Sequence, residues 1–211
     1  MQVAREGTAE SLALSPRLDG AEEALDDGLI DGAFTLSDAP PSPRHIEVAR
    51  SEVWWATRGA LRGVSQEEWR AALAADPRGA HPALQPCFRA EPDPVEEAWR
   101  ARNPALAAHL RAARASGLWP TFDDERRLLE HLERTPEAVA LVEVGRLRLY
   151  GLPLARLRVE GAREAAVSVW FRGREGDEPP LRRWRRFLEE GAQVSWARDL
   201  GWLPPRGGRA P

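Results

Sequence analysis

The stretch that decides the fold is residues 138–172, which read AVALVEVGRLRLYGLPLARLRVEGAREAAVSVWFR. Apolar and polar residues alternate there in four short runs: 138–144, 146–150, 154–160 and 165–172. Alternation with a period of two is typical of strands that bury one face, and glycine between such runs favours tight turns. The stretch therefore predicts a small antiparallel β-meander.

The residues before this stretch carry helix signals. Ser65 and Glu68 have the spacing of a capping box, so a helix is expected from there to about Ala75. Asp93-Pro94 and Asn103-Pro104 each place proline at the first helical position. We expect a further helix after Asp124, with leucines on its buried side.

These elements together predict an α+β fold. A helical half, residues 65–135, is expected to pack on the meander, and a strand that starts near His45 is expected to join the sheet. The sequence 181–190 has helical spacing with Trp184 in its apolar stripe, and we expect it to close the core. Residues 44–203 would then form a single globular domain, followed by a flexible tail at 204–211.

Residues 1–43 differ in composition and predict an acidic, largely flexible arm. Nine acids against two arginines give this segment a net charge of −7, which leaves +4 for the rest of a chain whose total is −3. The segment ends in a proline-rich spacer. Its apolar residues lie among acidic ones, a pattern typical of segments that become ordered when they bind a partner. The expected partner-docking residues are Leu25, Leu29, Ile30 and Phe34.

Composition restricts the class of protein. The 43% hydrophobic content is that of a soluble globular chain, and no apolar run is long enough to cross a bilayer. Cys87 is the single cysteine, which excludes an internal disulfide framework and fits a reducing cytoplasm. All basic residues are arginine. That bias indicates a GC-rich, bacterial genome and weakens any functional argument from arginine abundance.

The outer face of the predicted meander is the main candidate binding surface, because it combines arginine with aromatic residues. It carries Arg146, Arg148, Tyr150, Arg156, Arg158, Trp170 and Arg172. Such a surface can hold phosphates and stack on bases. A solvated sheet face has the same composition when arginine is the only cation, and both interpretations stay open. We expect the acidic arm to lie against this surface, since their charges are opposite.

No catalytic, cofactor-binding or metal-binding constellation is predicted. The four histidines lack metal-ligand spacing, and paired acids such as Asp123-Asp124 are explained by the first turn of a helix. We therefore expect a non-enzymatic, cytoplasmic protein-binding module: an adaptor, an assembly component or an immunity-type partner. Two alternatives remain, a nucleic-acid-binding protein that uses the arginine surface, and an enzyme whose site assembles only in three dimensions. The sequence does not predict an oligomeric state.

Overall fold

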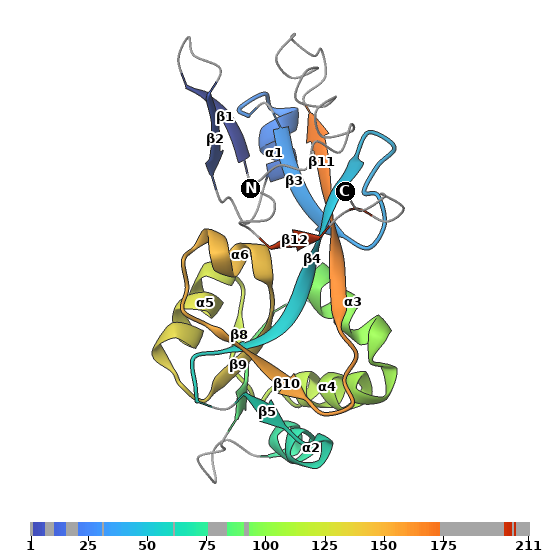
Figure 1. Cartoon of the computed structure of the whole chain (residues 1–211), viewed down its shortest axis with the longest axis vertical. Helices are drawn as coiled ribbons and strands as arrows, with labels where there is room; N and C mark the ends of the chain where they lie inside the picture. Colours follow the sequence, from blue (N-terminus) through green and yellow to red (C-terminus); the bar gives the residue numbers. More distant parts are fainter. Residues whose placement is uncertain are drawn as a thin grey trace. The chain divides into compact units, whose positions relative to one another are not determined.

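The chain contains both helices and strands, in an order that mixes runs of strands with helices, which confirms the α+β class (Figure 1). The computed structural model describes residues 2–6, 11–15, 21–30, 32–60, 62–75, 84–90, 93–173, 201–203 and 205. The chain divides into two compact units: unit 1 comprises 1–51 and 167–211, and unit 2 comprises 52–166. The strands β4 (Ile46–Thr57) and β11 (Ala165–Gly173) run through both units.

The sheet of unit 2 is centred on β4. This strand pairs antiparallel with β9 (Ala138–Glu143) and with β10 (Ala155–Val159). Two short strands, β6 (Gln85–Pro86) and β5 (Gly63–Val64), add in parallel to β9 and β10. A separate parallel pair consists of β7 (Phe88–Arg89) and β8 (Thr121–Phe122).

This pairing corrects the predicted meander. The strands β9 and β10 both pair with β4, whose paired residues lie 82 to 102 positions earlier in the chain, rather than with each other. Residues 146–150, expected to be a strand, belong instead to the helix α6 (Val144–Leu149) and its C-cap Tyr150. The Glu143 carboxylate accepts hydrogen bonds from the backbone N–H groups of Gly145 and Arg146, which starts a helix where the leucine–arginine alternation alone favours a strand.

The other helices of unit 2 begin where the cap signals predict. They are α2 (Gln66–Ala74), α3 (Pro94–Arg102), α4 (Pro104–Ser116) and α5 (Glu125–Arg134). The capping box of Ser65 and Glu68 is present in full. Gly117 ends α4 in the left-handed conformation, with φ of 64°, which glycine adopts without steric cost.

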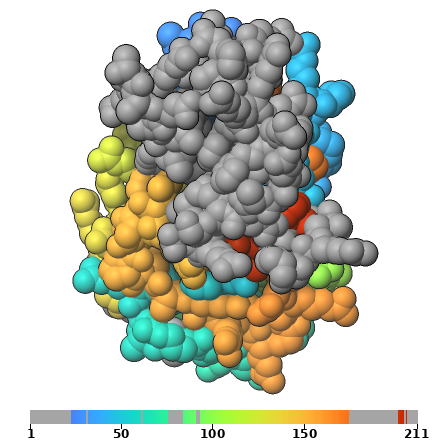
Figure 2. Space-filling view, turned by 45° about the horizontal axis from the view of Figure 1, so that its top comes forward, coloured from blue at the N-terminus to red at the C-terminus, as the bar shows by residue number. Residues whose placement is uncertain are grey.

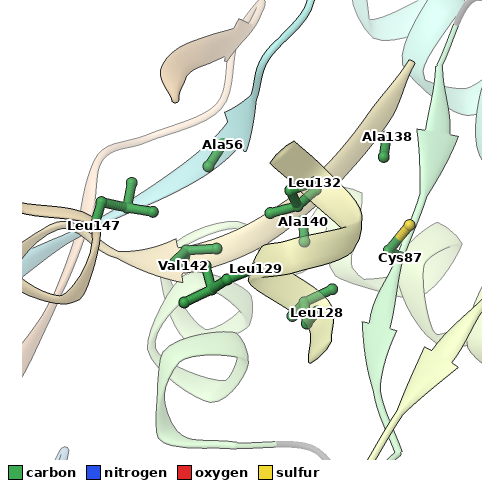
Figure 3. Packing of buried hydrophobic residues seen from close by; sticks show 9 residues of the cluster. All are labelled: Ala56, Cys87, Leu128, Leu129, Leu132, Ala138, Ala140, Val142 and Leu147. Carbon is green, nitrogen blue, oxygen red and sulfur yellow. The ribbon is translucent and has the colours of Figure 1, made fainter. Parts of the chain in front are cut away.

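The core of unit 2 lies between α5 and the sheet. Leucines 128, 129 and 132 of α5 approach alanines 138 and 140 and Val142 of β9, and Leu147 of α6 completes the cluster (Figure 3). Cys87 is buried in the same cluster. Three buried tryptophans form a further aromatic group: Trp55, Trp69 and Trp99. The ring centroid of Trp55 lies 4.4 Å from that of Trp69 and 5.5 Å from that of Trp99.

Unit 1 contains much of the segment expected to be a flexible arm. The strand β1 (Gln2–Glu6) pairs with β2 (Ser11–Ser15) and with β3 (Gly32–Ser37). The strand β3 also pairs antiparallel with β11, and Phe34 lies opposite Phe171. A short helix, α1 (Ala21–Asp26), precedes β3, and β12 (Trp202–Leu203) pairs with β4.

Part of the segment expected to be a flexible arm is instead buried in two small clusters: Phe34 packs with Val169 and Phe171 of β11, and Leu25 and Ile30 pack with Ala24 and Ala33. The Phe34 ring centroid lies 5.1 Å from that of Phe171 and 5.7 Å from that of Trp202. The predicted helix at 181–190 lies outside the described residues, as does the predicted tail apart from Pro205.

Candidate functional site

Three strand-to-helix junctions in unit 2 bring charged residues together. The strand β7 leads to α3, β8 leads to α5, and β9 leads to α6. An acidic side chain caps each helix: Asp93 accepts from the backbone N–H of Glu96 at 2.9 Å, and Asp124 accepts from that of Arg126 at 2.8 Å. Glu143 caps α6. The carboxyl ends of strands followed by helices are common ligand positions in α/β structures.

An ion-pair triad lies at these junctions and joins α5, β9 and α6. The Arg146 guanidinium donates from Nη1 to Oε2 of Glu125, and its Nε lies 4.0 Å from Oε2 of Glu143. Both carboxylates are buried, with 4% of Glu125 and 2% of Glu143 exposed. The Arg146 side chain keeps 27% of its surface exposed. Among the described residues, Nη2 of Arg146 has no hydrogen-bond partner.

The electrostatics of the triad follow from burial and charge. Burial raises the pKa of Glu125, the nearby positive charge of Arg146 opposes this, and Asp93 raises the pKa further. Burial acts to lower the pKa of Arg146, but the carboxylates of Glu125 and Glu143 outweigh it, so that the net direction is upward. Burial and the Arg146 charge therefore act in opposite directions on the pKa of Glu125, and burial is the larger effect.

The side chain of Arg114, on α4, binds the residues at the junction between β7 and α3. Its guanidinium donates to the Glu96 carboxylate and to the backbone carbonyls of Arg89 and Ala90. It also lies over the Phe88 ring, 5.2 Å from the centroid. The Arg114 and Glu96 side chains are only 17% and 7% exposed. Arg114 thus connects α4 with the loop that carries Asp93.

The structure does not bring the predicted arginine surface together on one sheet face. Arg146, Arg148 and Tyr150 lie on α6 or at its end, Arg156 and Arg158 on β10, and Trp170 and Arg172 on the unit 1 part of β11. Their contacts also differ. Arg146 forms an ion pair with Glu125, and Arg172 forms one with Asp26. Arg156 forms an ion pair with Glu164 at 3.0 Å and lies 5.8 Å from the centroid of the Trp54 ring. The Trp170 indole N–H donates to the Ser37 carbonyl at 2.9 Å.

The pair between Arg172 and Asp26 is one contact between the acidic segment and an arginine of the predicted surface. It is confined to unit 1. The predicted docking residues are mostly buried in the same unit, since Leu25, Ile30 and Phe34 are 2%, 5% and 8% exposed. Leu29, at 69%, is the exposed member of the four.

Two residues of the triad were not predicted from the sequence. Glu143 follows the apolar run of β9 directly and precedes Gly145, a pattern that agrees with a helix cap as well as with a turn. Glu125 carries no sequence signal, because a carboxylate in the first turn of a helix is normally explained by the helix dipole alone. Its burial depends on packing against β9 and α6.

Nucleophile and metal chemistry have little support in the described residues. Burial raises the pKa of the Cys87 thiol to about 12, and the thiol donates to the Gln85 carbonyl at 3.4 Å, so Cys87 is a buried core residue. In the part of the chain that the structure describes, no group of three His, Cys, Asp or Glu residues could hold a metal ion. Among the described helices, none is both long and apolar enough to cross a membrane. A cytoplasmic location stays a prediction.

Comparisons with known proteins identify the fold. No protein-family model matches the chain, and no curated protein matches it. A phosphate-bound ABC transporter substrate-binding protein from Clostridium perfringens is similar, with a TM-score of 0.57 and 9% identity over 87% of this chain and 83% of that one. PEB3 with bound L-phospholactate is also similar, with a TM-score of 0.56 and 12% identity over 87% and 83%. At such low identity the likeness shows the fold alone.

Proposed function

We propose that the chain is a non-enzymatic binding protein for a small anionic ligand and that Arg146 anchors this ligand. The observation that carries the proposal is the geometry of Arg146, whose guanidinium is held by two buried carboxylates while the side chain stays 27% exposed. The amber segment around residue 150, which includes part of α6, lies at the surface in Figure 2.

A fixed guanidinium suits anion recognition for two physical reasons. Its planar donors match carboxylate and phosphate oxygens, and each charge-assisted hydrogen bond contributes about 1.5–3 kcal/mol net. The ion pairs with Glu125 and Glu143 hold the side chain before the ligand arrives, so less conformational entropy is lost on binding. Nη2 retains donors for this purpose among the described residues.

Two further observations support a binding role of this kind. The structures with the same fold contain phosphate and L-phospholactate, and both of those ligands are small anions. The triad itself consists of two carboxylates and a guanidinium, which are not the hydroxyl, thiol and imidazole groups of a nucleophile–base arrangement. The chemistry present therefore favours binding over catalysis.

The proposal is tested by calorimetry and thermal denaturation with phosphate, L-phospholactate and sulfate. We expect binding by the native chain and a loss of about tenfold or more in Arg146→Gln, which removes one charge-assisted contact. Arg146→Lys keeps the charge but loses the fork and is expected to bind weakly as well. The matched control is Arg134→Gln, which changes an exposed arginine at the other end of α5. Absence of binding of all three anions to the native chain would overturn the proposal.

The protein-binding role expected from the sequence, as an adaptor or similar partner, has less support than anion binding. Of its four proposed docking residues Leu29 alone is exposed, and single exposed leucines are ordinary. Nucleic-acid binding is likewise weakened, because the seven surface residues lie on three different elements. The adaptor role would become the preferred one if a partner protein stayed bound to the chain through gel filtration and the chain bound none of the three anions.

A further inference from the structure

We infer that anion binding at Arg146 is coupled to uptake of a proton by Glu125, so that the affinity for the anion rises as the pH falls. This inference rests on the proposed function and concerns the regulation of the same site. It is carried by the charge balance of the triad and by the hydrogen bonds that each carboxylate accepts.

The charge balance makes an added anion costly. Glu125, Glu143 and Arg146 together carry a formal charge of −1, and both carboxylates are buried. A ligand that takes hydrogen bonds from Arg146 adds further negative charge and weakens the attraction between Arg146 and the Glu125 carboxylate. A buried carboxylate that loses its partner is strongly destabilised unless it takes up a proton.

The hydrogen bonds select Glu125 as the group that takes up the proton. Glu143 accepts from two backbone N–H groups at 2.8 Å, and Asp93 and Asp124 each accept from one. Such bonds favour the ionised form of a carboxyl group. Among the described residues, Glu125 accepts no backbone N–H, and its hydrogen bond comes from Arg146 alone.

The other groups that face the triad do not take up the proton in place of Glu125. Arg89 on β7 and Arg126 on α5 are the other cations near these groups. Tyr150 at the end of α6 stays neutral, because burial and the charge of Glu125 raise its pKa. Burial also raises the pKa of Glu125 before any ligand arrives, and withdrawal of the Arg146 charge would raise it further. A higher pKa in the bound state means tighter binding at lower pH.

Sulfate is the suitable probe, because it remains a dianion over the range tested, whereas phosphate groups themselves titrate there. We expect sulfate to bind the native chain about tenfold more tightly near about pH 5.5 than near about pH 8, as a shift of one pKa unit implies. Calorimetry in buffers with different ionisation enthalpies should show proton uptake on binding. This measurement needs no variant.

Two variants assign the proton. Glu125→Gln keeps an acceptor for Arg146 without charge, so its sulfate affinity near about pH 8 should rise about tenfold and become independent of pH. Glu130→Gln removes a partly exposed carboxylate of the same helix and should retain the native pH dependence. Equal sulfate affinity at both pH values without proton uptake, but with loss of binding in Arg146→Gln, would overturn the coupling and leave the proposed function intact. Failure of sulfate, phosphate and L-phospholactate to bind at either pH would overturn both.

Discussion

At the scale of single residues, Arg114 shows how much a buried charge can hold in place. It is the shared partner of the Glu96 carboxylate, two backbone carbonyls and the Phe88 ring. Replacement of one partner of a buried pair leaves the other uncompensated, which typically costs about 3–5 kcal/mol. Replacement of both by apolar groups of similar size is often neutral.

Arg114→Ala is therefore expected to lower the free energy of unfolding by about 3 kcal/mol or more, measured by urea denaturation. Arg111→Ala, at an exposed position of the same helix, should change it by no more than about 0.5 kcal/mol. The double variant Arg114→Met with Glu96→Leu should recover part of the loss. Equal stability of Arg114→Ala and Arg111→Ala would show that Arg114 does not hold the β7–α3 loop.

At the scale of elements, local signals were sufficient where the deciding interactions are local. The helices α2, α3 and α5 start at capping residues that the sequence shows directly, because a cap contacts backbone only two or three positions away. The strand with which another strand pairs can lie far away in the sequence. Alternation at β9 and β10 predicted strands correctly, but no local pattern indicates that both pair with β4.

The helix α6 is the element where the sequence was misleading, and its stability should depend on one carboxylate. With six residues it is too short to be stable alone, so the Glu143 cap and the packing of Leu147 must hold it. Glu143→Ala is expected to cost about 1–2 kcal/mol locally and to raise hydrogen exchange at Gly145 and Arg146 by about tenfold. Glu137→Ala, at an exposed position just before β9, is the control. Unchanged exchange in Glu143→Ala would mean that packing alone maintains the helix.

At the scale of the whole molecule, the acidic N-terminal segment is the main departure from expectation. Its apolar residues are too sparse in sequence to suggest a core, yet Leu25, Ile30 and Phe34 are buried. Phe34 packs against Val169 and Phe171 of β11, which pairs with β3 although more than a hundred positions separate the two in the chain. Composition within the segment could not reveal a partner so far away. The candidate site was hidden for the same reason, since Glu125 and Arg146 come from different elements.

Removal of residues 1–43 should therefore destabilise the chain rather than leave it unchanged. The deletion takes away β3, the partner of β11, and the ring contacts of Phe34 with Phe171 and Trp202. Each large apolar side chain contributes about 1.5–3 kcal/mol by burial, so a loss of about 5 kcal/mol and a fall of about 10 °C or more in melting temperature are expected. In the full chain, Phe34→Ala alone should cost about 3–5 kcal/mol, whereas Leu29→Ala, at an exposed position, should cost almost nothing. A truncated chain that melts within a few degrees of the full chain, together with a neutral Phe34→Ala, would restore the flexible-arm interpretation, because neither result is compatible with a strand that completes the core of unit 1.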